Sequence, residues 1–281
     1  MREVNALIIT GYGINCEKEM AAACEMAGAR TTILHAHLLL KGRIALEDYQ
    51  LLGFPGGFSF GDELGAGKAF ANRLTYAEGK LKEQLREYVD NGNCILGICN
   101  GFQLLVKLGL LPGLGNAQTL SLTGNDSGRF ESRWVNHTVT ASPCIFTQGI
   151  DQLYLPVRHG EGKLIAKDEE TQQALEKGNH IVLKYADNKG LPTQRYPENP
   201  NGSPNAIAGL CDTTGRILGM MAHPEAALLY TNHPQWLRHK EQANRNRRPL
   251  PKEGPGLILF KNAIEHLKIS PCKQSITSSL A

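Results

Sequence analysis

Short apolar runs alternate with amphipathic stretches along the first part of the chain. The apolar runs predict buried strands at Ala6–Thr10, Thr31–His35, Leu51–Phe54 and Cys94–Ile98. The stretches between and after them predict helices at Cys16–Ala27, Ala66–Leu74, Leu81–Val89 and Phe102–Leu108. Strands that alternate with helices in this way are typical of a parallel sheet with helices on both faces.

The second half of the chain has more turn residues between its apolar runs, which favours antiparallel pairing. Strands are expected there at Arg133–Thr140, Ile181–Tyr185, Ala206–Leu210 and Ile217–Met221. An amphipathic helix is expected at Leu257–Leu267, followed by a frayed tail at Ile269–Ala281. No repeat or internal linker divides the chain. We therefore expect an α/β protein with a mixed, mostly parallel central sheet and flanking helices, in a single domain over residues 1–281.

Composition narrows the class of protein. The 281 residues are 41% hydrophobic and 20% charged, which fits a globular chain and excludes a disordered or collagen-like one. The formal net charge of +3 is too small to indicate nucleic-acid binding. No run reaches the roughly 18 apolar residues that a membrane span needs. The seven cysteines include no Cys-x-x-Cys pair, so we expect reduced thiols and a cytoplasmic location.

One segment differs from the rest of the chain in charge. Arg238–Lys252 carries a net charge of +5, which leaves about −2 for the remaining residues. Its basic residues are Arg238, Lys240, Arg245, Arg247, Arg248 and Lys252. We expect an exposed loop, part of a basic insertion over residues 232–256 that precedes the terminal helix at 257–267. Two interpretations are open: a solvated surface loop, or a docking segment for an acidic surface of a partner protein.

The strongest chemical signal is Gly97-Ile98-Cys99-Asn100-Gly101, at the end of an apolar strand. It has the form of a nucleophile elbow with cysteine as the nucleophile. Glycines two residues before and after the nucleophile give room for a tight turn between strand and helix. The N-terminus of the following helix then points at the thiol and favours its thiolate form.

A thiolate nucleophile needs a base, and the base needs a group that orients it. His223-Pro224-Glu225 follows the strand expected at Ile217–Met221, and proline favours extended backbone at the residue before it. Side chains two residues apart in an extended segment share one face. Glu225 is therefore placed to accept the Nδ1–H of His223 while Nε2 faces a thiol.

Acyl transfer through a thioester also needs backbone N–H donors for the oxyanion. The Gly56-Gly57 pair follows the strand expected at Leu51–Phe54, so the N–H groups of Gly57 and Asn100 are the candidates. The carboxyl ends of parallel strands meet at one edge of the sheet, which brings these loops together. A phosphate-binding function is disfavoured because the chain has no Walker-type glycine loop.

Longer sequence motifs around these residues resemble those of a known family. They are Pro-Gly-Gly-Phe-Ser-Phe-Gly-Asp at 55–62, Gly-Ile-Cys-Asn-Gly-Phe-Gln at 97–103, His-Gly-Glu-Gly at 159–162 and Met-Met-Ala-His-Pro-Glu at 220–225. Together they resemble the class I glutamine amidotransferases, which have a flavodoxin-like fold. Within that class they are similar to the glutaminase subunits of phosphoribosylformylglycinamidine synthase.

The resemblance implies a mechanism for individual residues. Cys99 would attack the side-chain amide of L-glutamine, with His223 as general base and acid and Glu225 orienting it. The amides of Gly57 and Asn100 would hold the oxyanion. The substrate-binding residues implied are Gln103, Gly56 and His159.

The resemblance also implies partners. Ammonia would pass to a synthetase subunit that converts formylglycinamide ribonucleotide to its amidine in purine synthesis, in some complexes with a small bridging subunit. ATP and Mg²⁺ would bind to that synthetase, and no cofactor is expected on this chain. Docking of Arg238–Lys252 onto the synthetase is the functional interpretation of the basic segment. The alternatives are a catalytically silent subunit of the same fold and an elbow-cysteine hydrolase of another pathway.

The sequence predicts no metal site and no second reactive thiol. His35 and His37 share a strand face but have no third ligand at a convincing spacing. Cys16 follows the first strand, which places it near the expected active edge of the sheet, but it has no base partner in the sequence. Four other cysteines are expected to be inert core or loop residues: Cys24, Cys94, Cys144 and Cys211.

Overall fold

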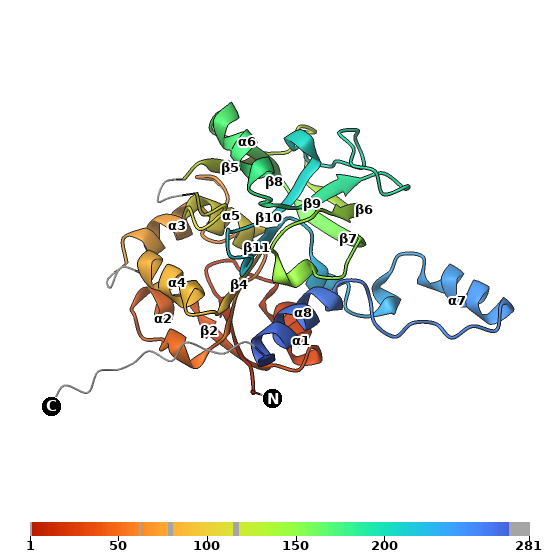
Figure 1. Cartoon of the computed structure of the whole chain (residues 1–281), viewed down its shortest axis with the longest axis horizontal. Coiled ribbons are helices and arrows are strands. Elements are labelled where there is room, and N and C mark those ends of the chain that lie inside the picture. Colours follow the sequence, from red (N-terminus) through yellow and green to blue (C-terminus); the bar gives the residue numbers. More distant parts are fainter. Residues whose placement is uncertain (1, 62, 78–80, 115–117, 270–281) are drawn as a thin grey trace.

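A computed structural model describes residues 2–61, 63–77, 81–114 and 118–269 (Figure 1). Parallel strands form one part of the sheet, and all of them except the largely exposed edge strand are buried. In spatial order these are β2 (Arg30–His35), β1 (Asn5–Thr10), β3 (Leu51–Phe54), β4 (Cys94–Ile98) and β11 (Ile217–Met220). The strand β11 arrives from the far end of the sequence and pairs with β4, residue for residue from Ile217–Ile95 to Met220–Ile98.

The same sheet continues beyond β11 with antiparallel strands. Their order is β10 (Ile207–Cys211), β9 (Ile181–Ala186), β6 (Glu131–Val139) and β7 (Gln152–His159), which completes a nine-stranded mixed sheet. A separate antiparallel pair is formed by β5 (Leu120–Gly124) and β8 (Glu161–Ala166). The expected mixed α/β fold is confirmed. Antiparallel pairing is confined to the second half of the chain, but β11, which was expected among the antiparallel strands, also pairs parallel with β4.

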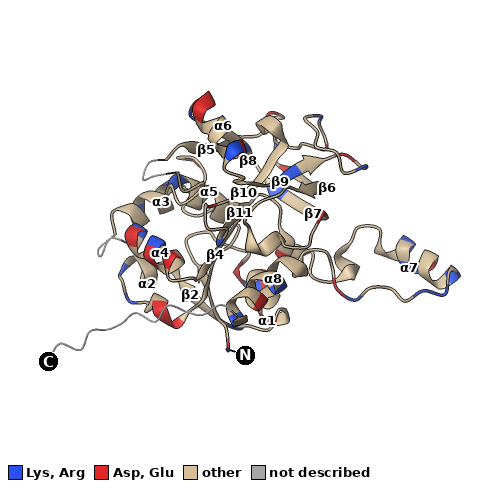
Figure 2. Ribbon diagram, in the orientation of Figure 1, with Lys and Arg blue, Asp and Glu red and all other residues tan. Residues whose placement is uncertain are grey.

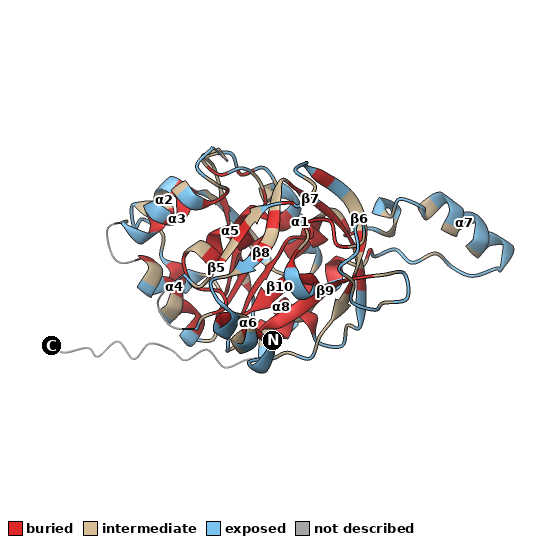
Figure 3. Cartoon of the chain, turned by 90° about the horizontal axis from the view of Figure 1, so that it is seen from above, coloured by how far each residue is buried: buried red, intermediate tan, exposed pale blue. Residues whose placement is uncertain are grey.

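Helices cover both faces of the parallel strands (Figure 1). On one side α1 (Glu17–Met26) packs against β1, β2 and the terminal helix α8 (Leu257–Ile269). On the other side α5 (Asn100–Lys107) packs against β4 and α3 (Lys68–Thr75), with α4 (Leu81–Asp90) beside α3. Figure 3 shows the sheet and the inward faces of these helices buried together.

The predicted elements of the first half agree with the structure to within two residues at most ends. Two helices begin elsewhere than expected. The backbone at Gly65 and Gly67 is left-handed, with φ of +93° and +71°, so α3 begins only at Lys68. In contrast, α5 begins two residues early, at Asn100, because the helix starts directly after the elbow.

Several elements were missed by the sequence prediction. They are α2 (Ala36–Leu40), β5, β7, β8 and α6 (Glu169–Lys177). The strand β7 contains Pro156, which argues against a central strand, but β7 lies at the edge of the sheet, where proline is tolerated.

The basic segment is not the exposed loop that the sequence predicted. Its first part forms a helix, α7 (Trp236–Arg245), that projects away from the body of the protein (Figures 1 and 2). Polar residues with good helix propensity and an Arg245–Glu241 ion pair at i,i+4 spacing (2.9 Å) explain why a segment without buried residues is helical. The expected exposure is confirmed, since none of its residues is buried.

The segment is closed at its base like a hairpin. Tyr230 N–H donates to the carbonyl of Lys252 (3.0 Å), and Leu229 and Glu253 form an antiparallel bridge. Residues 230–252 therefore leave and return to the body at one place, and we call them the arm.

The other expectations concern the termini, the thiols and the membrane. The predicted tail Ile269–Ala281 lies outside the described residues, apart from Ile269, which ends α8. The six cysteines of the described part of the chain are free thiols. Across residues 2–269, outside the gaps named above, no helix combines the length and apolarity that a bilayer crossing requires.

Candidate active site

Cys99 occupies a strained turn between β4 and α5. Its backbone has φ of +53° and ψ of −104°, a region that non-glycine residues rarely adopt. The flanking glycines are required, because a Cβ on Gly101 would lie 1.9 Å from the carbonyl oxygen of Phe54. On Gly97 a Cβ would lie 2.7 Å from the carbonyl oxygen of Gly101. The turn is thus the nucleophile elbow that the sequence predicts.

Loops from the carboxyl ends of β1, β3, β4 and β11 converge around this elbow. The loop after β1 is tied to the loop after β3, since Asn15 N–H and Cys16 N–H both donate to the carbonyl of Gly56 (3.2 and 3.3 Å). The loop after β11 is tied to β7, because His223 N–H donates to the carbonyl of Pro156 (2.8 Å). Cys99 N–H donates to the carbonyl of Met220 (2.8 Å), which joins the elbow to β11.

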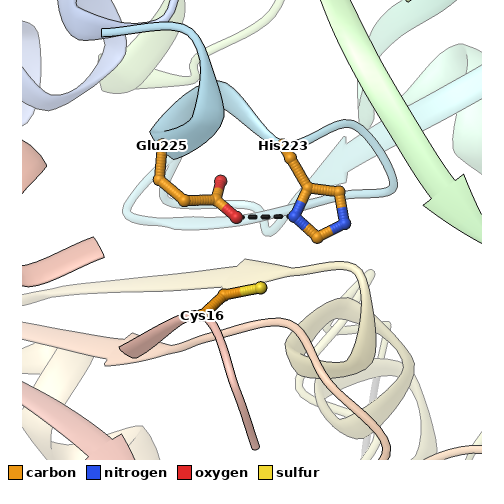
Figure 4. A group of neighbouring side chains, drawn as sticks. All are labelled: Cys16, His223 and Glu225. Atoms are coloured by element: carbon orange, nitrogen blue, oxygen red, sulfur yellow. Dashed lines mark hydrogen bonds and ion pairs between the residues drawn. The ribbon is translucent and has the colours of Figure 1, made fainter. Parts of the chain in front are cut away.

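His223 and Glu225 form a buried pair. The Nδ1 atom of His223 lies 2.5 Å from Oε1 of Glu225, and their side chains are 3% and 0% exposed (Figure 4). Pro224 begins a short 3₁₀ turn, Pro224–Ala226, which aims the carboxylate back at the imidazole. The predicted His-x-Glu pairing is therefore present in the geometry.

The environment of His223 favours its protonated form. Burial lowers the pKa of the imidazole, but the negative charge of Glu225 raises it. The neighbouring thiols of Cys16 and Cys99 raise it further, so the pKa lies well above its ordinary value. Within the described part of the chain Nε2 has no hydrogen-bond partner, so this nitrogen is free for a substrate or thiol proton.

Gly56 marks the point where the thiol and the imidazole meet. A Cβ on this residue would lie 2.7 Å from Cε1 of His223, 3.5 Å from Cβ of Cys99 and 3.3 Å from Sγ of Cys16. Glycine is therefore needed at this position, because all three residues approach its backbone closely. In this structure the thiol of Cys99 points at the carbonyl of Arg158, at 3.5 Å.

Two backbone N–H groups face no acceptor among the described residues and are free for an oxyanion: those of Gly57 and Asn100. Gly57 has φ of +143°, and a Cβ there would lie 2.6 Å from the carbonyl oxygen of Gly13. The side chain of Asn100 is held by Ser59 N–H, which donates to its Oδ1 (3.3 Å). The helix N-terminus is thereby fixed beside the thiol.

Two polar residues were predicted to bind substrate, Gln103 and His159. Both lie beside the elbow, and their side chains form hydrogen bonds with other residues of the protein. Gln103 accepts from Nδ2 of Asn100 (3.0 Å) and donates from Nε2 to the carbonyl of Glu161 (2.6 Å). His159 is 2% exposed, and its Nδ1 lies 3.0 Å from Oδ1 of Asn125. Burial, with a smaller contribution from the charge of His223, lowers the pKa of His159 to about 3, so the ring is neutral. Their contact with substrate stays a prediction.

Cys16 lies in the site, whereas the sequence placed it only near the active edge of the sheet, without a base partner. Its Sγ, a ring nitrogen of His223 and a carboxylate oxygen of Glu225 all lie within 4.8 Å of one another (Figure 4). The only signal in the sequence is that Cys16 follows the first strand of a parallel sheet. A histidine more than two hundred residues away supplies the partner that no local pattern could indicate.

Comparison with known proteins agrees with this geometry. The model of the CobB/CobQ-like glutamine amidotransferase domain matches residues 3–267. The phosphoribosylformylglycinamidine synthase subunit PurQ of Methanococcus maripaludis strain C5 is 44% identical over 265 residues, which cover 92% of this chain and 97% of that protein. The subunit PurQ of Dehalococcoides mccartyi is 43% identical over 267 residues, covering 94% and 98%.

Solved structures give the same relationship. The structure of PurLQS from Thermotoga maritima superposes with a TM-score of 0.68 at 25% identity, over 95% of this chain and 100% of the matched chain. A second glutamine amidotransferase from Thermotoga maritima has a TM-score of 0.51 at 17% identity, covers 95% of this chain and 97% of its own, and shares the fold. With relatives this similar along nearly its whole length, the chain belongs to the PurQ family of phosphoribosylformylglycinamidine synthase glutaminase subunits, within the CobB/CobQ-like glutamine amidotransferases.

Proposed function

We propose that this glutaminase subunit hydrolyses L-glutamine through a thioester on Cys99 and delivers the ammonia to a synthetase subunit. The observation that carries the proposal is the elbow cysteine in a strained backbone, with a buried His223–Glu225 pair just after the neighbouring strand β11. This arrangement supplies a nucleophile, a proton carrier and a group that orients the carrier.

The first half of the reaction forms the thioester. The sulfur of Cys99 attacks the side-chain amide carbon, and the carbonyl oxygen becomes an oxyanion held by the N–H groups of Gly57 and Asn100. His223 carries the thiol proton to the leaving nitrogen, so ammonia departs as the C–N bond breaks. The raised pKa of His223 keeps this proton available at neutral pH.

The second half returns the enzyme to its starting state. A water molecule gives a proton to His223 and attacks the thioester, and glutamate leaves as the proton returns to the sulfur. Glu225 keeps Nδ1 protonated throughout, so that Nε2 is the nitrogen that exchanges the proton. Gln103 and Asn100 brace the helix start, while the neutral ring of His159 lines the site without adding charge.

The relatives indicate the receiving partner. PurQ is by name a subunit of phosphoribosylformylglycinamidine synthase, and PurLQS has been solved as an assembly. We propose that this chain likewise serves a synthetase that binds ATP and Mg²⁺, with a small bridging subunit in the complex. In that complex ammonia would convert formylglycinamide ribonucleotide to its amidine, and this chain would need no cofactor of its own.

The arm is the segment proposed to dock onto that synthetase. Its helix α7 is exposed along its whole length, and among the described residues only Arg245 of its cations forms an ion pair (Figure 2). An exposed, mostly unpaired basic helix on a tethered base suits an acidic protein surface. Replacing residues 231–251 by a short glycine linker should weaken complex formation and glutamine-dependent synthesis, with glutamine hydrolysis by the free chain retained. Unchanged glutamine-dependent synthesis would leave only the solvated-surface interpretation.

Labelling of Cys99 tests the glutaminase chemistry. A glutamine-analogue electrophile should modify this residue, and excess glutamine should protect it. Cys99→Ala should abolish glutamine-dependent synthesis by the complex and keep ammonia-dependent synthesis. Cys24→Ala is the matched control, because Cys24 is buried in α1 and its pKa is raised to about 12 by burial and then by Glu25.

Each alternative gives a different result in these assays. A catalytically silent subunit would not react in a glutamine-protected manner. A hydrolase of another pathway would react, yet neither nitrogen source would support synthesis by the complex. Loss of ammonia-dependent synthesis in Cys99→Ala would assign the cysteine a structural role.

A further inference from the structure

We propose that Tyr12, Phe60 and Arg73 are positioning residues that hold the N–H of Gly57 where the oxyanion forms. The three side chains form one contact group, in which the two rings stack and the guanidinium of Arg73 lies against both. They act through the backbone and need not touch the substrate. The inference rests on the proposed function, because it concerns the oxyanion donors of that reaction.

The loops after β1 and β3 pair with each other around Gly57. Phe58 N–H donates to the carbonyl of Gly13 (2.9 Å), and Phe60 N–H donates to the carbonyl of Tyr12 (2.6 Å). Gly57 itself forms an antiparallel bridge to the loop after β1, and a Cβ on it would lie 2.6 Å from the carbonyl oxygen of Gly13. The position of the Gly57 peptide is therefore set by the register in which the two loops pair.

The two loops are strained at the residues that stack. Tyr12 has φ of +56° and Phe60 has φ of +62°, in the left-handed region that bulky residues rarely adopt. Such a backbone persists only where surrounding contacts hold it. The two rings supply a contact of this kind, with centroids 4.2 Å apart and planes 22° from parallel. Without the stack either residue can relax to negative φ and shift the pairing beside Gly57.

Arg73 connects this loop pair to the helix that carries the second oxyanion donor. It lies in the last turn of α3, and its Cζ is 4.7 Å from the ring centroid of Phe60 and 5.8 Å from that of Tyr12. The helix α3 packs against α5, which begins at Asn100. Ser59 N–H, which donates to Oδ1 of Asn100 (3.3 Å), is the second link. An oxyanion needs both donors at hydrogen-bond distance together, so these links set a geometry that matters for the rate.

Steady-state kinetics of glutamine hydrolysis by the full chain in its synthase complex test the stack. Tyr12→Ala removes one ring and should lower kcat by about 10- to 100-fold, less than the 10²–10³-fold that loss of a whole oxyanion donor costs. The KM for glutamine should stay unchanged, because the oxyanion is absent from the bound ground state. Tyr12→Phe keeps the ring and should restore the wild-type kcat.

Two reagents that react with Cys99 give a second readout. In an aldehyde analogue of glutamine the thiol adds across the C=O bond, so that a sulfur–carbon bond forms and the oxygen, which takes the proton, lies in the oxyanion position. Iodoacetamide alkylates the same sulfur by displacing iodide, and no oxyanion forms. Tyr12→Ala should weaken inhibition by the aldehyde about 10-fold and leave the alkylation rate unchanged. A merely structural disturbance of the elbow would slow both reactions.

A second variant keeps the test open if Tyr12→Ala does not fold. Arg73 is exposed, so Arg73→Gln should fold with the wild-type thermal transition. It removes only the cation and should lower kcat by about 2- to 5-fold, again without a change in KM. Arg73→Lys keeps a charge beside the rings and should lose less. Arg43→Gln, at another exposed arginine, is the matched control and should change nothing.

The outcomes separate this inference from the proposed function. A wild-type kcat in Arg73→Gln, and in Tyr12→Ala where it folds, would overturn the inference and leave the glutaminase reaction standing. Equal losses in the aldehyde and iodoacetamide reactions, or no rescue by Tyr12→Phe, would overturn it too and assign the stack a structural role. A wild-type complex that neither hydrolyses glutamine nor is inhibited by the aldehyde would refute the proposed function itself.

Discussion

Replacing Glu225 by glutamine tests the core of the proposed mechanism with a minimal change in shape. The carboxylate lies 2.5 Å from Nδ1 of His223, and both groups are buried, so solvent cannot substitute for it. Glutamine has two ways to fill the position. Its carbonyl can accept the Nδ1–H without a charge, or its amide can donate to Nδ1 and force the proton onto Nε2.

The two orientations of the glutamine side chain set the lower and upper limits of the expected loss of activity. A hydrogen bond to a charged group contributes about 1.5–3 kcal/mol, which corresponds to about 10–150-fold in rate at 1.36 kcal/mol per tenfold. In the second orientation Nε2 can no longer accept a proton, and the wrong tautomer costs about 10⁴-fold in comparable triads. We therefore expect Glu225→Gln to lower kcat by about 10- to 10⁴-fold.

The pH dependence gives a second readout. Glu225 supplies the charge that holds the pKa of His223 up against the lowering effect of burial. Without that charge the pKa falls, so the protonated imidazole that serves the leaving ammonia is lost at lower pH. The alkaline limb of the kcat profile should move to lower pH.

The assay follows glutamate release by the complex over a range of pH, with ammonia-dependent synthesis measured in parallel. Glu253→Gln is the matched control, because Glu253 is exposed and its ion-pair partner among the described residues is Lys261, at 2.6 Å. A threefold loss or less in Glu225→Gln, with an unchanged pH profile, would refute the view that this carboxylate orients and charges His223.

Two further predictions concern the elbow and the buried histidines. Gly101→Ala places a Cβ 1.9 Å from the carbonyl oxygen of Phe54, so its free energy of unfolding, measured by urea denaturation, should fall by roughly 3 kcal/mol. Gly124→Ala is the control and should be near neutral, because a Cβ there meets open space. His137 is buried against Tyr185, and burial lowers its pKa to about 4. The unfolded chain then binds the extra proton as pH falls through 6.5, so stability is present above that pH and lost below it, by about 2 kcal/mol between pH 7 and 5. His137→Phe should remove this part of the acid sensitivity in urea titrations, and equal pH slopes for variant and wild type would contradict the assignment.

The catalytic constellation could be predicted from sequence because each of its parts is local. The elbow needs two glycines around Cys99, and the orienting carboxylate needs only the i, i+2 spacing of an extended segment, so both constraints lie within a few residues. The buried parallel strands β1, β3, β4 and β11 could be predicted equally well, because a strand buried on both faces is a continuous apolar run. The helix of the arm could not be predicted, because α7 has no buried apolar face that would give a helical period of hydrophobic residues.

The sequence by itself therefore determined the class of fold and predicted Cys99, His223 and Glu225 as the candidate catalytic residues. The tertiary structure decided what lies around these residues. Cys16 joins the site only because β1 and β11 end at the same edge of the sheet, and β11 reaches that edge from the opposite end of the chain. Packing brings together residues that no sequence spacing relates, so the proximity of Cys16 to His223, the buried neutral His159 and the tethered base of the arm emerge only in three dimensions.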